Sequence, residues 1–198
     1  MRIVQAFLIA LAFGLALPRQ ASATGDSQMT MGEVLSQTRA VVRGVVVDQF
    51  SQWEENDGNK IIFTYSTLKV DNGLFGKLPP MENVVVRTVG GDVDGYRQVL
   101  IDEASFELGE EAVVFLALED GWLHTSVAGF HQGKYTVVRN PTGRILGLRQ
   151  DAGEKLDSSQ LEKRPLIPLS RFADDLRRAR TGLVRGDTSE IHPLVRVR

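Results

Sequence analysis

The residues best suited to metal chemistry are the three histidines, His124, His131 and His192. His124 and His131 lie seven residues apart on either side of Gly129, so the two imidazoles could meet at one end of a hairpin. A catalytic zinc ion takes three protein ligands, and no third ligand accompanies this pair in the sequence. We therefore predict structural histidines, with no metal and no cofactor, and keep a small metal-dependent hydrolase using His124 and His131 as an alternative.

Carboxylates form the second set of candidate chemical groups. Residues 92–95, Asp-Val-Asp-Gly, resemble the start of a calcium loop, but the rest of the EF-hand pattern is missing, which favours a surface turn. Glu103, Glu107, Glu110 and Glu111 offer several carboxylate pairs, yet a glycosidase pair needs a defined sugar cleft around it. We interpret these acids as solvated charge around the start of a strand.

The sequence signals of nucleophilic catalysis are missing. The chain has no cysteine, and Ser66, Ser105 and Ser126 do not lie in a Gly-x-Ser-x-Gly setting. The pair Gly90-Gly91 is not followed by the Lys-Ser/Thr of a phosphate-binding loop, so we predict a bend at the corner of a barrel. The sequence therefore predicts that the protein is not an enzyme.

Aromatic residues in polar or glycine-rich surroundings favour binding instead. Trp53 lies in a polar segment, and Tyr96 and Phe130 lie next to glycine-rich turns. Aromatic side chains gathered on one face of a small β-domain can contact a protein or peptide. We predict Trp53, Tyr96 and Phe130 as partner-binding residues, with the alternative that they cap the ends of a barrel core.

The N-terminal residues have the pattern of a signal peptide. Met1-Arg2 is positive, residues 3–17 are apolar except for Gln5, and Ala21-Ser22-Ala23 forms a cleavage site, so Thr24 should start the mature protein. The apolar run is shorter than the roughly 20 residues that span a bilayer. We expect a periplasmic or secreted protein, without a membrane span after cleavage after Ala23.

The net charge bears on the kind of partner, and the cysteine content bears on the source of stability. Without residues 1–23 the chain has 21 basic and 25 acidic residues, a net charge of −4. Nucleic-acid-binding domains are normally basic, so we expect no nucleic-acid partner. A chain without cysteine must take its stability from a hydrophobic core, and we expect a monomer.

Runs of β-branched residues between turn residues predict most of the secondary structure. Gly44 inside the first run predicts a bulge, and residues 48–59 predict a long exposed loop that carries Trp53. Thr30 and Glu33 form a capping box for a short helix, and a second helix should run from Ser170, its cap, to a stop at Gly182. The predicted strands cover residues 40–47, 60–70, 83–89, 112–118, 122–127, 134–139 and 144–148.

These elements predict a mainly all-β fold. Short strands with glycine bends suit a small OB-like Greek-key β-barrel with a short N-terminal helix and a C-terminal helix. The apolar run 112–118 should be a central strand covered on both faces. We divide the chain into a signal peptide (1–23), the barrel domain (24–148), and a linker with the C-terminal helix (149–198), which packs on the barrel or trails it.

Two segments resemble the netrin-like domains, which include the tissue inhibitors of metalloproteinases. They are Val-Val-Arg-Gly-Val-Val at 41–46 and Phe-Thr-Tyr-Ser-Thr-Leu-Lys-Val at 63–70, followed by Gly76-Lys77 in an order reversed from that of the family. The chain also resembles a set of exported bacterial proteins of unknown activity, through Gly90-Gly91 and the Phe-x-x-Gly-Glu step at 106–110. The resemblance implies an OB-type fold. The inhibitors use an N-terminal cysteine on the target's zinc, which this chain lacks.

We therefore expect an exported, non-enzymatic binding or accessory module of the bacterial cell envelope that contacts a protein or peptide partner. A protease inhibitor of the netrin-like kind, working through loops instead of a cysteine, is one alternative. The metal-dependent hydrolase is the other.

Overall fold

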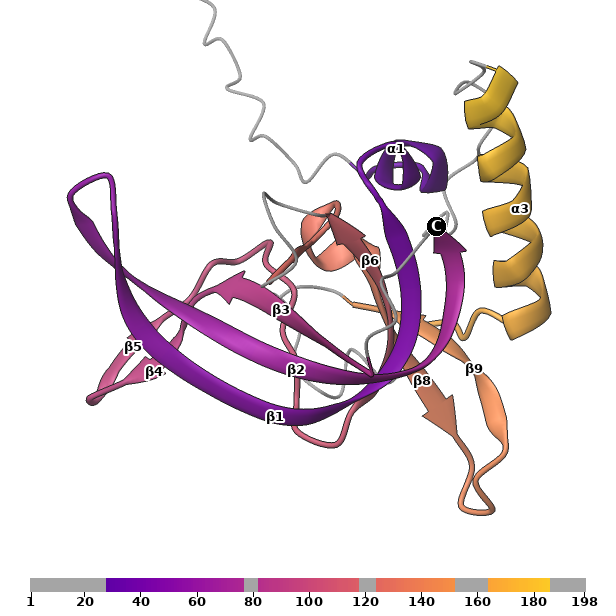
Figure 1. Ribbon diagram of the computed structural model, residues 1–198. Coiled ribbons are helices and arrows are strands. Elements are labelled where there is room, and N and C mark those ends of the chain that lie inside the picture. Colours follow the sequence, from indigo (N-terminus) through magenta and orange to yellow (C-terminus); the bar gives the residue numbers. More distant parts are fainter. Residues whose placement is uncertain (1–27, 77–81, 118–123, 152–163, 186–198) are drawn as a thin grey trace, which may run out of the picture.

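The computed structural model describes residues 28–76, 82–117, 124–151 and 164–185 (Figure 1). Strands dominate these residues, which confirms the all-β class, and one helix stands near each end. The elements are α1 (Met31–Ser36), β1 (Ala40–Asn56), β2 (Asn59–Gly76), β3 (Asn83–Val89), β4 (Gly91–Val93), β5 (Tyr96–Gln98), β6 (Glu111–Ala117), β7 (Ser126–Val127), the 3-10 turn η1 (Phe130–Gly133), β8 (Lys134–Arg139), β9 (Ile145–Gln150) and α3 (Leu169–Arg185).

One antiparallel sheet organises the chain, in the order β3-β2-β1-β6-β8-β9, with β7 paired to β6. The predicted barrel is not closed. Between β3 and the β7 region there is one isolated parallel bridge, Val86 with Thr125, flanked by the hydrogen bonds Arg87 N to Thr125 O (2.8 Å) and Thr125 N to Val85 O (3.0 Å). Among the described residues, no ladder pairs β3 with β7.

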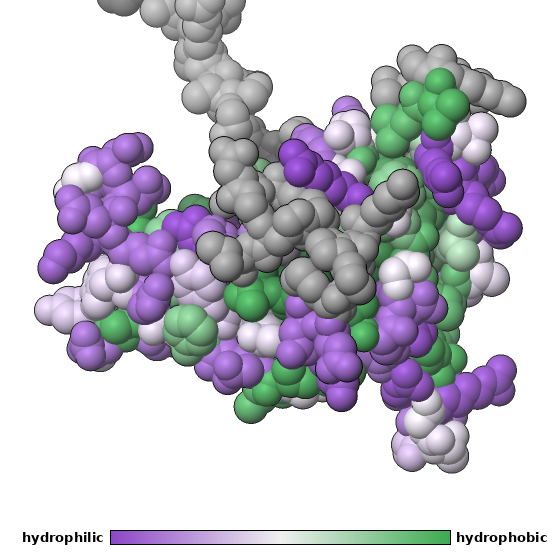
Figure 2. Space-filling model, in the orientation of Figure 1, coloured by the Kyte–Doolittle hydropathy of each residue, from purple (hydrophilic) through white to green (hydrophobic). Residues whose placement is uncertain are grey.

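The β1–β2 hairpin is much longer than the sequence predicts. Strand pairing continues through the predicted loop at 48–59 to a two-residue turn, Asp57-Gly58, where both φ angles are positive (48° and 78°). The loop prediction was wrong because residues 48–56 form a strand with polar side chains on both faces. Their Asp, Gln, Ser and Glu residues therefore lack the apolar pattern by which a strand is predicted. We call residues 47–67, the part of this hairpin beyond the β6 ladder, the arm; hydrophilic side chains cover its tip (Figure 2).

Bulges bend β1 and β2 into the arc seen in Figure 1. The register with β2 shifts between Val41 and Val42, between Arg43 and Gly44, and between Val46 and Asp48. A Cβ on Gly44 would lie 2.5 Å from the carbonyl oxygen of Lys69, so only glycine allows the two backbones to approach this closely. The bulge predicted at Gly44 is therefore confirmed.

Two hydrophobic clusters lie on opposite faces of the sheet. On one face α1 and α3 cover the sheet, and Phe115, Tyr135 and Phe172 stack there with ring centroids 5.1–6.1 Å apart. The other face holds a cluster of mainly small and β-branched residues that Phe106 completes. Five consecutive residues of β6, from Ala112 to Leu116, are buried, as predicted for a central strand.

Both predicted helices exist, with one change of bounds. The Thr30 and Glu33 capping box of α1 is present. The second helix begins at Leu169, before Ser170, and continues past Gly182 to Arg185. A glycine inside a helix costs about 1 kcal/mol, and Leu183 packs against the core just beyond it. Among the described residues, no helix is long and apolar enough to cross a membrane.

Candidate binding cleft beside the β1 edge

A cleft of about 440 Å³ opens on the concave side of the arm. Its walls come from segments that are distant in sequence: the arm, the end of β3, the β4–β5 hairpin and the stretch that leads to β6. The lining residues are Gln49, Phe50, Ser51, Thr64, Thr88, Val89, Gly90, Gly91, Asp92, Arg97, Gln98, Val99, Leu100, Glu103, Ala104, Ser105 and Phe106.

The floor of the cleft is polar, and hydrogen bonds fix its shape. Ser51 Oγ and Thr64 Oγ1 are 2.8 Å apart across the β1–β2 pair, and Thr64 Oγ1 donates to the carbonyl oxygen of Gly90 (2.7 Å). The side-chain oxygen of Gln98 accepts from Ile62 N (3.0 Å). These bonds tie the β4–β5 hairpin to the arm, so the cleft has a preformed base.

Gly90 and Gly91 form the bend that carries the chain from β3 into β4, as predicted for this pair. Their φ angles of 110° and 131° lie where side chains other than glycine are strained. A Cβ on Gly91 would also collide with the hydroxyl groups of Thr64 and Ser51. The pair thus lets β4 lie directly against the arm.

Three charged side chains line the cleft: Asp92, Arg97 and Glu103. Burial raises the pKa of Glu103 above its ordinary value, and hydrogen bonds from the Ala104 and Val89 amides oppose this only in part. The carboxyl of Glu103 therefore ionises less readily than an exposed glutamate.

Large apolar side chains remain exposed at the rim. Phe50, Val99 and Leu100 line the cleft while 49%, 47% and 45% exposed, and Ile101 beside them is 52% exposed. Adjacent apolar residues with this much exposure are typical of a surface that a partner covers. The ring of Phe50 stacks on Tyr65 on the other face of the arm, so the apolar rim consists of residues 99–101, a run that was visible in the sequence.

On the convex face of the arm, opposite the cleft, Phe50 belongs to a cluster of contacting side chains from β1, β2 and β3. Phe50 stacks on Tyr65 with ring centroids 5.1 Å apart. Tyr65 donates to Glu54, and Arg87 Nη2 lies 2.8 Å from Glu54 Oε2. Burial raises the pKa of Glu54, but the hydrogen bonds from Tyr65, Gln52 and Arg87 outweigh it and lower the pKa overall. These contacts join β1, β2 and β3 on the convex face of the arm.

A buried ionic network supports the opposite wall. Lys134 Nζ lies 2.9 Å from Glu110 Oε1 and 3.5 Å from Asp151 Oδ2, donates to the carbonyl oxygen of Ser105, and stands 4.9 Å from the ring centre of Phe106. Its side chain is 5% exposed. Lys134 thereby fixes the segment that leads to β6 against β8. No pattern in the sequence pointed to this lysine, and Glu110, whose side chain is 10% exposed, is paired in the network instead of solvated as predicted.

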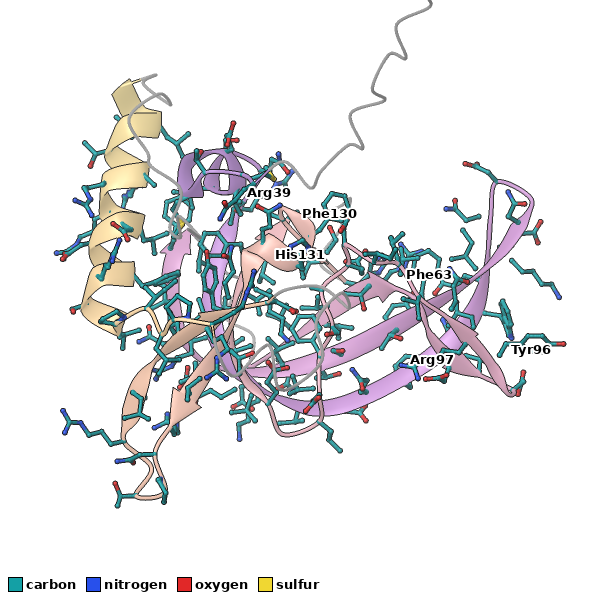
Figure 3. The ribbon with its side chains drawn as sticks, turned by 180° about the vertical axis from the view of Figure 1, so that it is seen from behind. Arg39, Phe63, Tyr96, Arg97, Phe130 and His131 are labelled. Carbon is teal, nitrogen blue, oxygen red and sulfur yellow. The ribbon has the colours of Figure 1, made fainter. Side chains whose placement is uncertain are left out.

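Two of the three predicted partner-binding residues come together. Trp53, on β1 instead of in a loop, contacts Tyr96 of β5 edge to face, with ring centroids 5.8 Å apart. Phe130 lies elsewhere: it is 56% exposed in η1 with a φ of 54°, and Figure 3 shows it beside His131, away from Tyr96. Trp53 and Tyr96 form a ridge at the arm, to which Phe130 does not belong.

The histidines have structural contacts. His131 is buried, and its Nδ1 lies 2.9 Å from the carbonyl oxygen of Asp102. His124 packs its ring against Tyr65, 6.0 Å between centroids. His192 lies outside the described residues. Within the described part of the chain, no three His, Cys, Asp or Glu residues are grouped so that they could hold a metal ion.

The Asp94-Gly95 pair forms the turn of the β4–β5 hairpin, with φ angles of 53° and 80°. The surface turn predicted for residues 92–95 is therefore confirmed. The predicted mature start at Thr24, which an N-terminal inhibitory mechanism would need, lies outside the described residues.

No protein-family model matches the chain, and no curated protein matches it. The resemblance to netrin-like domains and to exported bacterial proteins therefore stays a prediction.

Proposed function

We propose that this protein is a non-catalytic binding module of the cell envelope that holds a segment of a partner protein in the cleft beside β1. The observation that carries the proposal is the cleft itself. It combines a polar floor fixed by hydrogen bonds with an exposed apolar rim of Val99 and Leu100. Preformed shape and apolar contact area are what a protein-binding site requires.

The sequence of residues 1–23 supports export, because it has the charge, length and cleavage pattern of a signal peptide. Mass spectrometry of the protein expressed in a bacterial host should find Thr24 at the N-terminus in the envelope fraction. A full-length protein in the cytoplasm would contradict this part of the proposal.

Site-directed cross-linking tests the binding function. Since the chain has no cysteine, Leu100→Cys and Leu146→Cys each introduce one unique thiol for a photo-cross-linker. The two leucines are similarly exposed, 45% and 51%, but Leu146 lies on β9 and does not line the cleft. We expect a discrete cross-linked partner from position 100 and none from position 146.

Equal cross-linking from both positions, or none from position 100, would overturn the proposal. Leu100→Asp and Leu146→Asp provide the matched binding pair. We expect Leu100→Asp to weaken capture of the identified partner about tenfold or more, as loss of a buried apolar contact does. Leu146→Asp should leave capture unchanged.

A further inference from the structure

We propose that the partner segment joins the sheet as an additional strand along the unpaired edge of β1, and that this segment is extended and basic. The inference rests on the proposed function, because it specifies how the partner is held in the same cleft. Strand addition uses backbone hydrogen bonds for affinity and side-chain pockets for selectivity.

The edge of β1 is paired along only part of its length. Its ladder with β6 covers Ala40 to Val45, and the hydrogen bonds of Val46 with Gly109 and Glu110 end it. Beyond this point no strand among the described residues pairs with that edge. We call residues 47–56 of β1 the free edge. A strand edge of this length presents a row of backbone donors and acceptors to any chain that can lie beside it.

The cleft reaches the backbone at this edge. Gln49, Phe50 and Ser51 all line it, although consecutive side chains of a strand point to opposite faces. Since the ring of Phe50 stacks on Tyr65 on the other face, the cavity reaches the backbone of β1 between the side chains of Gln49 and Ser51. Figure 3 shows the β4–β5 hairpin crossing β1, with Tyr96 near its tip, so the Trp53–Tyr96 ridge stands beside an added strand.

Charge identifies the partner's chemistry. Residues 47–60 and 91–98 hold six carboxylates and two basic side chains, Lys60 and Arg97. Of the six, Asp48, Glu55, Asp57, Asp92 and Asp94 are exposed. An extended segment with Lys or Arg at alternate positions would place its cations beside these acids.

The same charges disfavour a second copy of this chain. Two free edges paired antiparallel about Ser51 would place Asp48 of one copy opposite Glu54 of the other, on the same face of the joint sheet. Like charges directly opposite each other destabilise a strand pair. Acidic residues on an edge thus disfavour self-association in this register and favour a basic chain at the edge.

Synthetic peptides test the inference on the mature protein. The probes are a ten-residue peptide alternating Val and Lys, its Val/Glu counterpart, and two Val/Lys peptides N-methylated along one edge or the other. We expect the Val/Lys peptide to bind about tenfold or more tighter than the Val/Glu peptide at low salt. Methylation along the pairing edge should weaken binding about tenfold, and methylation along the outer edge should not.

Amide exchange measured by NMR supplies the structural readout. A strand added to β1 protects every second amide of residues 47–56, because alternate amides point to the free edge. Uniform protection, equal binding of the two methylated peptides, or no binding of the Val/Lys peptide would overturn strand addition by a basic segment. A dimer in sedimentation equilibrium with the same alternating protection would overturn it in favour of a second copy.

The two proposals fail in different ways. If position 100 cross-links a partner but the amides of β1 show no alternating protection from exchange, the binding function stands and strand addition is wrong. If position 100 captures no partner, the binding function itself is wrong.

Discussion

The helix-covered end of the sheet and the arm differ in how far their large side chains are buried. At the first end, α1 and α3 close over Phe115, Tyr135 and Phe172, which are at most 2% exposed. In the arm, Phe50 and Trp53 are 49% and 37% exposed, and pairs such as Ser51 with Thr64 replace a core. Since β1 and β2 extend from the arm into the helix-covered end, where Val41, Leu74 and Phe75 pack in the core, burial at one end can stabilise a surface at the other end that buries little.

A large test of this contrast is Phe172→Ala, at the centre of the aromatic cluster. Removing a fully buried phenylalanine should lower the free energy of unfolding by about 3–5 kcal/mol. Urea denaturation measures the change. Val184→Ala on the same helix is the control, because Val184 is 83% exposed and should change stability by less than about 0.5 kcal/mol. Equal effects of the two substitutions would refute the assignment of the stabilising core to this end.

Lys134→Met tests the connection between the two regions. The substitution leaves Glu110 and Asp151 buried without their cation and should cost about 3 kcal/mol. It also releases the Ser105 carbonyl, so amides of residues 105–110 should exchange faster with solvent. Lys69→Met, at an exposed position of β2, is the matched control. Unchanged exchange in residues 105–110 would show that the network does not hold this wall of the cleft.

Gly91→Ala should loosen the β4–β5 hairpin from the arm. The substitution combines a strained φ with a collision against Ser51 and Thr64, which should cost about 3 kcal/mol. In Gly95→Ala a Cβ meets nothing within 4 Å, so only the backbone strain of about 1 kcal/mol remains. Urea denaturation gives both values, and a cost for Gly95→Ala equal to that for Gly91→Ala would exclude tight contact between β4 and the arm.

Glu103→Gln should have the smallest effect, and one that depends on pH. Burial raises the pKa of Glu103 in the folded protein, so the folded state binds this proton more tightly than the unfolded state does. The stability that protonated Glu103 contributes to the wild-type protein is therefore greatest at a pH below its ordinary pKa of 4.5. This contribution decreases as the pH rises through the raised pKa of the folded state. The variant lacks this loss, so its stability relative to wild type should increase from pH 4 to pH 7. A pH-independent difference would contradict the pKa shift.

The sequence predicted best the parts of the fold that are apolar and bounded by turn residues. The bounds of β3 and β8 agree with the predicted strands, because each is a β-branched run between Gly, Pro or Asn residues. The β1 half of the arm was missed because its alternation of Phe50, Gln52 and Glu54 with Ser51 and Trp53 lacks a continuous apolar face. The cleft could not be predicted as a unit, since its walls meet only through the bend at Gly90-Gly91 and the network of Lys134.

The packing of α1 against α3 has a consequence for the order of folding. A six-residue helix is too short to be stable alone, and α1 obtains its burial from an element at the other end of the described chain. The pairing of β1 with β6 likewise cannot form until residues beyond 110 have been synthesised. Contacts so distant in sequence make folding slow. Most of the chain must therefore leave the ribosome before a stable core can form.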